Sequence, residues 1–209
     1  MAQNTREDII ACARRLFEER GYNGVSMRDI AGALDISVGN LTYHFKKKES
    51  LLEAILLSAG QDRQKLPPPQ TLEELRQYFL HMLEVQQTYA FYFDSYHQLA
   101  QTSPTLARIQ QELLGGVAND LRDALTHLRA SGLLTPEAYP GQSPALVRTL
   151  TVLLMSRLPG EDRRTTGPAG VQTVLNSLQG VLYPLLTEAG KKSLDSLCPP
   201  VYQEVSQKI

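Results

Sequence analysis

Residues 26–45 constrain the fold of this chain more than any other segment, because they encode two short helices joined by a tight turn. Ser26 and Asp29 have the spacing of a capping box, in which a side-chain oxygen accepts from first-turn N–H groups. Asp35 occupies the turn, where aspartate tolerates a positive φ better than most residues. Ser37 follows as the cap of the next helix. The segment therefore predicts helix, turn and helix.

The second of these helices is polar and uncharged on one side. Leu41 and Phe45, four residues apart, are expected to anchor it to a core. A lysine run at 46–48 follows the helix. The residues left to face outward are Gly39, Asn40, Thr42, Tyr43 and His44. A polar helix of this kind, followed by lysine side chains, suits the major groove of DNA.

An amphipathic helix is predicted in front of this pair. Thr5 and Asp8 have capping-box spacing, and Gly21 can supply a left-handed C-terminal cap. Apolar residues recur between them at helical spacing: Ile9, Ile10, Cys12, Ala13, Leu16 and Phe17. Ile30, Ala31 and Leu34 of the following helix are expected to face inward.

The head of the chain resembles the DNA-binding domain of the tetracycline-repressor (TetR/AcrR) family. The resemblance covers roughly the first quarter of the chain, in three parts with matching order and spacing. The matching residues are Ala13, Leu16, Phe17, Gly21 and Tyr22; Ser26, Asp29, Ile30 and Ala31; and Ser37, Gly39, Leu41, Tyr43, His44, Phe45, Lys48, Glu49, Leu51 and Leu52. The remainder of the chain is similar to the family in architecture only.

The resemblance implies a helix-turn-helix domain of three helices over residues 1–48 and a larger helical domain for effector binding and dimerisation over 49–209. It also implies DNA contacts from Arg28, Gly39, Asn40, Thr42, Tyr43, His44 and Lys48. The sequence departs from the family in two places. Asp35 stands where the family usually has glycine, and Thr42 stands where it often has tyrosine.

Side-chain chemistry divides the expected contacts further. Asn40 can read an adenine edge or bind a phosphate, and Thr42 can offer its methyl group to thymine. Tyr43, His44 and Lys48 are expected to hold phosphates and set the register, while Arg28 suits either role.

Some of these expected contacts also have a simpler interpretation. Tyr43 could pack on the first helix, and His44 could be an ordinary surface residue. Arg28 could pair with Asp29 or Glu49. The lysine run could be a solvated surface.

The rest of the sequence predicts further helices and no strands, which gives an all-α fold. Pro67 to Pro69 mark a linker. Helices are expected at 49–65, from Thr71 through Leu83, from Ser103 to Gly132, at 145–158 and at 171–186. A mobile segment is expected at 159–168, and a short tail helix around 198–200.

The last two major helices have more apolar surface than one core needs. Residues 145–158 are apolar almost all round, and 171–186 carry a leucine and valine stripe. We therefore expect a homodimer, held by a four-helix bundle with these two helices from each subunit. The alternative is that both helices are internal to one chain.

An effector cavity is implied by the family resemblance. The candidate lining residues are Tyr78, Met82, Tyr89, Phe93, Tyr96 and His97. They suit a small apolar or amphipathic molecule, although rings at helical spacing more often form a solid core. Asp94 and His97 share a helical face, but two ligands are too few for a metal site. No metal or other cofactor is expected.

Composition excludes several other classes of protein. The net charge of −1 shows that any affinity for DNA must come from local placement of charge. The 2 cysteines match no zinc site or disulfide scaffold. The chain has no HExxH, phosphate-binding loop or nucleophile elbow, so no enzyme is expected. It has no apolar signal region and no run of about 18 apolar residues, which predicts a cytoplasmic location without a membrane span.

These observations favour a ligand-responsive DNA-binding transcriptional regulator. The preferred form is a dimeric repressor that binds a palindromic operator in double-stranded DNA and is released by a small-molecule inducer. The alternatives are a helical small-molecule-binding or interaction module that does not regulate DNA, and a transcriptional activator.

Overall fold

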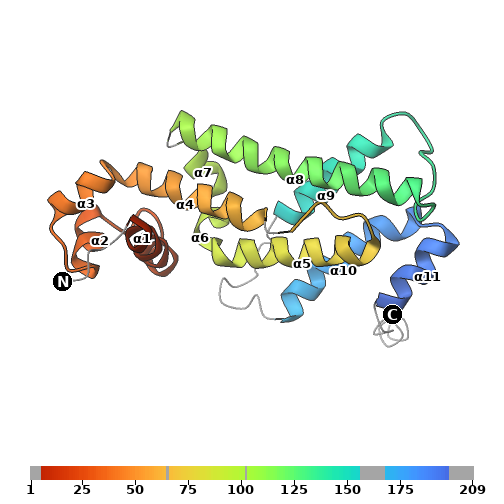
Figure 1. The fold of residues 1–209 in the computed structure, drawn as a ribbon, viewed down its shortest axis with the longest axis horizontal. Coiled ribbons are helices and arrows are strands. Elements are labelled where there is room, and N and C mark those ends of the chain that lie inside the picture. Colours follow the sequence, from red (N-terminus) through yellow and green to blue (C-terminus); the bar gives the residue numbers. More distant parts are fainter. Residues whose placement is uncertain (1–5, 65, 102, 156–167, 198–209) are drawn as a thin grey trace. The chain divides into compact units, whose positions relative to one another are not determined.

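The computed structural model describes residues 6–64, 66–101, 103–155 and 168–197. These ranges contain helices and no strands, as the sequence predicts (Figure 1). In chain order the elements are α1 (Arg6–Arg20), α2 (Met27–Ala33), α3 (Val38–His44), α4 (Lys48–Arg63), α5 (Leu72–Thr88), α6 (Ala90–Asp94), α7 (Tyr96–Ala100), α8 (Pro104–Ala130), α9 (Gln142–Met155), α10 (Pro168–Leu182), the short 3-10 helix η1 (Tyr183–Leu185) and α11 (Glu188–Leu197).

The first three helices pack around one apolar cluster. Leu16 and Phe17 of α1, Ile30 of α2 and Leu41 of α3 are all buried in it. Gly21 ends α1 with a φ of 73°, the left-handed cap that glycine adopts without strain. The head of the chain therefore has the inward-facing residues that its apolar periodicity predicts.

The described residues group into two compact units. One comprises residues 1–65 and 84–113, and the other 66–83 and 114–209. Helix α4 falls in the first unit with the head, because Leu51, Leu52 and Ile55 belong to the same buried cluster as α1. The predicted boundary at 48 falls at the first residue of α4.

The long helix α8 runs through the glycine pair at 115–116 without interruption. A Cβ placed on Gly115 would meet no other described atom within 4 Å. Close helix packing therefore does not explain Gly115. Gly132, with a φ of 74°, lies just after the end of this helix, which the sequence predicted to run to Gly132.

Helix α11 is absent from the sequence-based prediction, which placed a tail helix only around 198–200, outside the described residues. Its N-terminus is held by Thr187, whose hydroxyl accepts from the Gly190 N–H at 3.1 Å. A Cβ on Gly190 would lie 2.2 Å from the Leu133 carbonyl oxygen, so the close approach requires glycine. The helix was missed because Leu194 is its only buried leucine.

Residues 159–167, in the segment that we predicted to be mobile, also lie outside the described residues. Within the described ranges, no helix has both the length and the apolar character needed to cross a bilayer.

Candidate DNA-binding site

The turn between α2 and α3 is fixed by local interactions. Asp35 has a φ of 52°, the positive value that the sequence predicts. Beside it, the Ile36 N–H donates to the Ala31 carbonyl at 3.0 Å, and its side chain packs against the core. The Ser37 hydroxyl accepts from the Asn40 N–H at 3.0 Å. These contacts fix where α3 starts relative to α2.

The N-terminus of α2 carries the predicted capping box. The Asp29 N–H donates to the Ser26 hydroxyl at 3.2 Å, and the Ser26 N–H donates to the Asp29 carboxylate at 2.7 Å. The Ser26 hydroxyl also donates to this carboxylate at 2.5 Å. These bonds favour the charged form and lower the pKa of Asp29.

Asp29→Asn is expected to lower the unfolding temperature at neutral pH and to have less effect in acid. Because the pKa of Asp29 is lowered in the folded state, its capping box stabilises the fold fully at pH values above the pKa of an unfolded aspartate, which is about 4. This contribution is lost as the pH falls through the lower folded pKa. Thermal melts of both proteins between about pH 7 and pH 3 measure it. Ser26→Ala should show the same trend, and a pH-independent difference would contradict this role.

The inner side of α3 is pinned by two side chains. Leu41 is 0% exposed and Phe45, at the C-terminal cap, is 3% exposed. The Arg6 guanidinium lies 4.9 Å from the centre of the Phe45 ring. The seven-residue helix is thus held from one side only.

The opposite side of α3 faces solvent. Gly39 and Asn40 are exposed, and Tyr43 is 85% exposed. The interpretation that Tyr43 packs on the first helix is therefore wrong. Its ring meets the half-buried His44 ring edge to face, with 5.3 Å between centroids. A ring this exposed is available to a partner outside the chain.

Thr42 uses its hydroxyl proton within the helix. The hydroxyl donates to the Gly39 carbonyl at 3.0 Å, and the side chain is half-buried. Its methyl group and the hydroxyl lone pairs remain for other contacts.

Arg28 is exposed on α2. Among the described residues it pairs with neither Asp29 nor Glu49, so that alternative is not observed. Its guanidinium is therefore not held by either neighbouring carboxylate.

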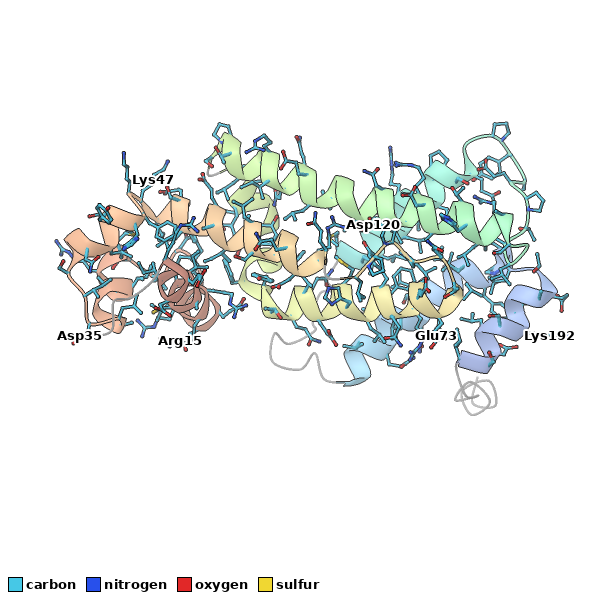
Figure 2. The ribbon with its side chains drawn as sticks, in the orientation of Figure 1. Arg15, Asp35, Lys47, Glu73, Asp120 and Lys192 are labelled. Carbon is cyan, nitrogen blue, oxygen red and sulfur yellow. The ribbon has the colours of Figure 1, made fainter. Side chains whose placement is uncertain are left out.

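The three lysines after α3 differ from one another. Lys46 and Lys47 are exposed, whereas Lys48 is half-buried and donates two hydrogen bonds inside the head. In the view of Figure 2, Lys47 and Asp35 lie at opposite edges of the head. The acidic turn is thus separated from the cationic end of α3.

Four of the six cavity candidates have described side chains, and all four lie at least partly inside the protein. Tyr78 and Met82 are buried in one apolar cluster, while Tyr89 and Phe93 belong to another. The Tyr78 hydroxyl donates to Asp120 at 3.0 Å. The side chains of Asp94, Tyr96 and His97 lie outside the described part of the structure. The pairing of Asp94 with His97 as metal ligands therefore stays untested. Among the described side chains, no group of three or more potential ligands could hold a metal ion.

Sequence reasoning missed a set of contacts that joins α1 and α4 to residues 89–91. The Tyr89 hydroxyl donates to the Asp62 carboxylate at 2.6 Å, and the Arg14 guanidinium lies 5.4 Å from the Tyr89 ring centre. Burial and this carboxylate raise the pKa of Tyr89. The Glu18 carboxylate accepts from the Phe91 N–H at 3.2 Å. No local pattern could reveal these contacts, because their partners are far apart in the sequence.

Two family models match the chain. Residues 9–55 match the model described as bacterial regulatory proteins of the tetR family. Residues 51–194 match the model described as bacterial transcriptional repressor. The match to the family therefore extends well beyond the head, which contains all of the sequence motifs that carry the resemblance.

Two curated relatives match the chain over about a quarter of its length. The HTH-type transcriptional regulator UidR of Escherichia coli is 45% identical over 56 residues, which are 27% of this chain and 29% of that protein. The HTH-type transcriptional regulator QacR of Staphylococcus aureus is 42% identical over 53 residues, 25% of this chain and 28% of that protein. The chain therefore spans less than a third of the length of these relatives.

Solved structures share the fold over most of the chain. A TetR-family transcriptional regulator from Marinobacter aquaeolei has a TM-score of 0.81 at 19% identity, over 93% of this chain and 97% of that one. The ketosteroid transcriptional regulator KstR2 of Mycobacterium tuberculosis has a TM-score of 0.58 at 22% identity, over 90% and 97%. At these identities the likeness supports the fold alone.

Proposed function

The chain belongs to the tetR family of bacterial transcriptional regulators, and on this basis we propose that it is a ligand-responsive repressor that binds a palindromic operator as a dimer. A small-molecule inducer releases it from DNA. The description of the model matched by residues 51–194 favours repression over activation.

One observation carries the DNA-binding part of this proposal. Helix α3 buries Leu41 on one side and leaves Asn40 and an 85% exposed Tyr43 on the other. Exposing an aromatic ring to water has no benefit for the fold, whereas a groove of DNA can receive it. Helix α3 therefore enters the major groove, and α2 crosses the backbone.

The outward residues of the head have separate roles in this complex. Asn40 reads an adenine edge or holds a phosphate, and the bare backbone at Gly39 allows close approach. Thr42 presents its methyl group to thymine, because its hydroxyl proton already bonds the Gly39 carbonyl. Tyr43 and His44 hold phosphates, and Arg28 contacts the DNA from α2.

Dimerisation uses the outer faces of α9 and α10. Leu150 and Leu154 of α9 are fully buried within the chain, and Val152 between them is 58% exposed. On α10, Leu175 and Leu178 are buried within the chain. The exposed residues at helical spacing on α10 are Thr173, Ser177 and Gly180. Small side chains of this kind let helices approach closely, so these faces suit a second copy of the chain.

The inducer acts by binding one arrangement of the two heads more tightly than the other. A shift from 1:99 to 99:1 requires a difference in affinity of about 5.5 kcal/mol between the two states. The effector contacts are those that the resemblance implies, and the ones with described side chains are Tyr78, Met82, Tyr89 and Phe93. The effector is small and apolar or amphipathic.

Selection of bound fragments from random duplex DNA tests this function. The purified chain is expected to enrich an inverted repeat whose half-site centres are about one helical turn apart. Affinity for this site should fall steeply with salt, because phosphate contacts release counterions. Absence of any enriched sequence at low ionic strength would contradict the proposal.

A further inference from the structure

Lys48 differs from its two lysine neighbours in where its ammonium group lies. The Nζ atom is 2.9 Å from the Tyr22 carbonyl oxygen and 2.9 Å from the Val25 carbonyl oxygen. It also lies 4.1 Å from the centre of the Tyr22 ring. Two of its three N–H donors thus bond the segment between α1 and α2.

The ammonium suits this place, because one compact cation can satisfy both carbonyl oxygens and the face of a ring. The Tyr22 carbonyl also accepts from the Val25 N–H at 3.4 Å, so the two carbonyls belong to one tight turn. Burial lowers the pKa of Lys48. Helix α4 therefore begins with a charged group directed into the head.

These hydrogen bonds connect the first residue of α4 to the segment before α2, and the chain itself connects it to α3. Along the chain, only residues 45–47 separate Lys48 from α3. Through its hydrogen bonds it also holds the residues that lead into α2. A displacement of the start of α4 must therefore act on α2 and α3 together.

We propose that Lys48 is a positioning residue that makes the orientation of the recognition helix depend on α4. It serves DNA recognition through the 22–25 turn, in place of the phosphate contact that the family resemblance implies. This inference rests on the proposed function, since orientation of α3 matters to the extent that α3 reads DNA.

Lys48→Met separates the two roles, with Lys47→Met as its matched control. Methionine keeps an unbranched stem near the Tyr22 ring and removes the ammonium. Both variants are titrated with the selected site and with an unrelated duplex, at several salt concentrations and well below the unfolding temperature. For each, the measured quantities are the ratio of specific to non-specific affinity and the slope of log affinity against log salt.

The positioning role predicts that Lys48→Met lowers this ratio about tenfold, the effect of roughly one misread base pair. Its salt slope should stay at the wild-type value, because no phosphate contact is lost. Amide hydrogen exchange in α2 should rise in this variant. Lys47→Met should keep the wild-type ratio and exchange.

Other outcomes overturn the inference. A salt slope reduced by about 0.9 per subunit, with an unchanged specificity ratio, would make Lys48 a phosphate contact. A lower unfolding temperature with unchanged affinities would leave it a purely structural role. If the wild-type chain selects no DNA site, the proposed function fails and this inference fails with it. If the wild type selects a site and Lys48→Met binds normally, the inference fails alone.

Discussion

Asn40→Ala is expected to lower affinity for the selected DNA site by about a hundredfold or more, without loss of stability. A bidentate contact between asparagine and adenine contributes about 1–3 kcal/mol of discrimination, and a dimer loses two of them. The Asn40 side chain is exposed, and it is the backbone N–H of this residue that bonds Ser37. The substitution should therefore change the free energy of unfolding by less than about 0.5 kcal/mol.

Asn119→Ala is the matched control, since Asn119 is also an exposed asparagine but lies on α8, outside the head. Fluorescence anisotropy with labelled duplexes gives the affinities, and thermal melts confirm that each variant is folded. Equal affinities for wild type and Asn40→Ala would show that the outward side of α3 does not read DNA. A large loss in Asn119→Ala would place the contact surface outside the head.

Val152→Glu is expected to convert the dimer into a monomer and to lower operator affinity by more than about a hundredfold. Val152 is 58% exposed in the single chain, so glutamate there costs the monomer little. In the proposed interface, two unpaired carboxylates from the paired subunits would lose their hydration. The second head would then no longer be held on its half-site, and the DNA contacts would be halved.

Sedimentation at micromolar concentration measures the change in assembly. Leu57→Glu is the control, because Leu57 of α4 is 53% exposed and lies outside the proposed interface. A monomeric wild type would contradict the dimer. A dimeric Val152→Glu would place the interface on another surface.

The parts of the head that sequence predicts are those fixed by neighbours in the chain. Ser26, Asp29, Asp35 and Ser37 act within a few residues of themselves, so their types specify caps and a turn. The burial of Leu41 likewise follows from helical spacing. Local chemistry thus predicted the shape of the candidate site.

Contacts over long sequence separations could not be predicted in this way. Lys48 bonds carbonyls 26 and 23 residues earlier, and its place in a lysine run indicated an exposed cation. Likewise, Tyr78 hydrogen-bonds Asp120 and Tyr89 hydrogen-bonds Asp62, partners 42 and 27 residues away. Helical spacing alone assigns both rings to the protein interior and does not identify these partners.

Methylation interference on the selected site tests most directly whether α3 lies in the major groove. Methyl groups at guanine N7 project into the major groove, and those at adenine N3 project into the minor groove. The account predicts that N7 methylation blocks binding in two segments about one helical turn apart, on the same face of the duplex. Interference confined to adenine N3, or binding indifferent to both modifications, would contradict it.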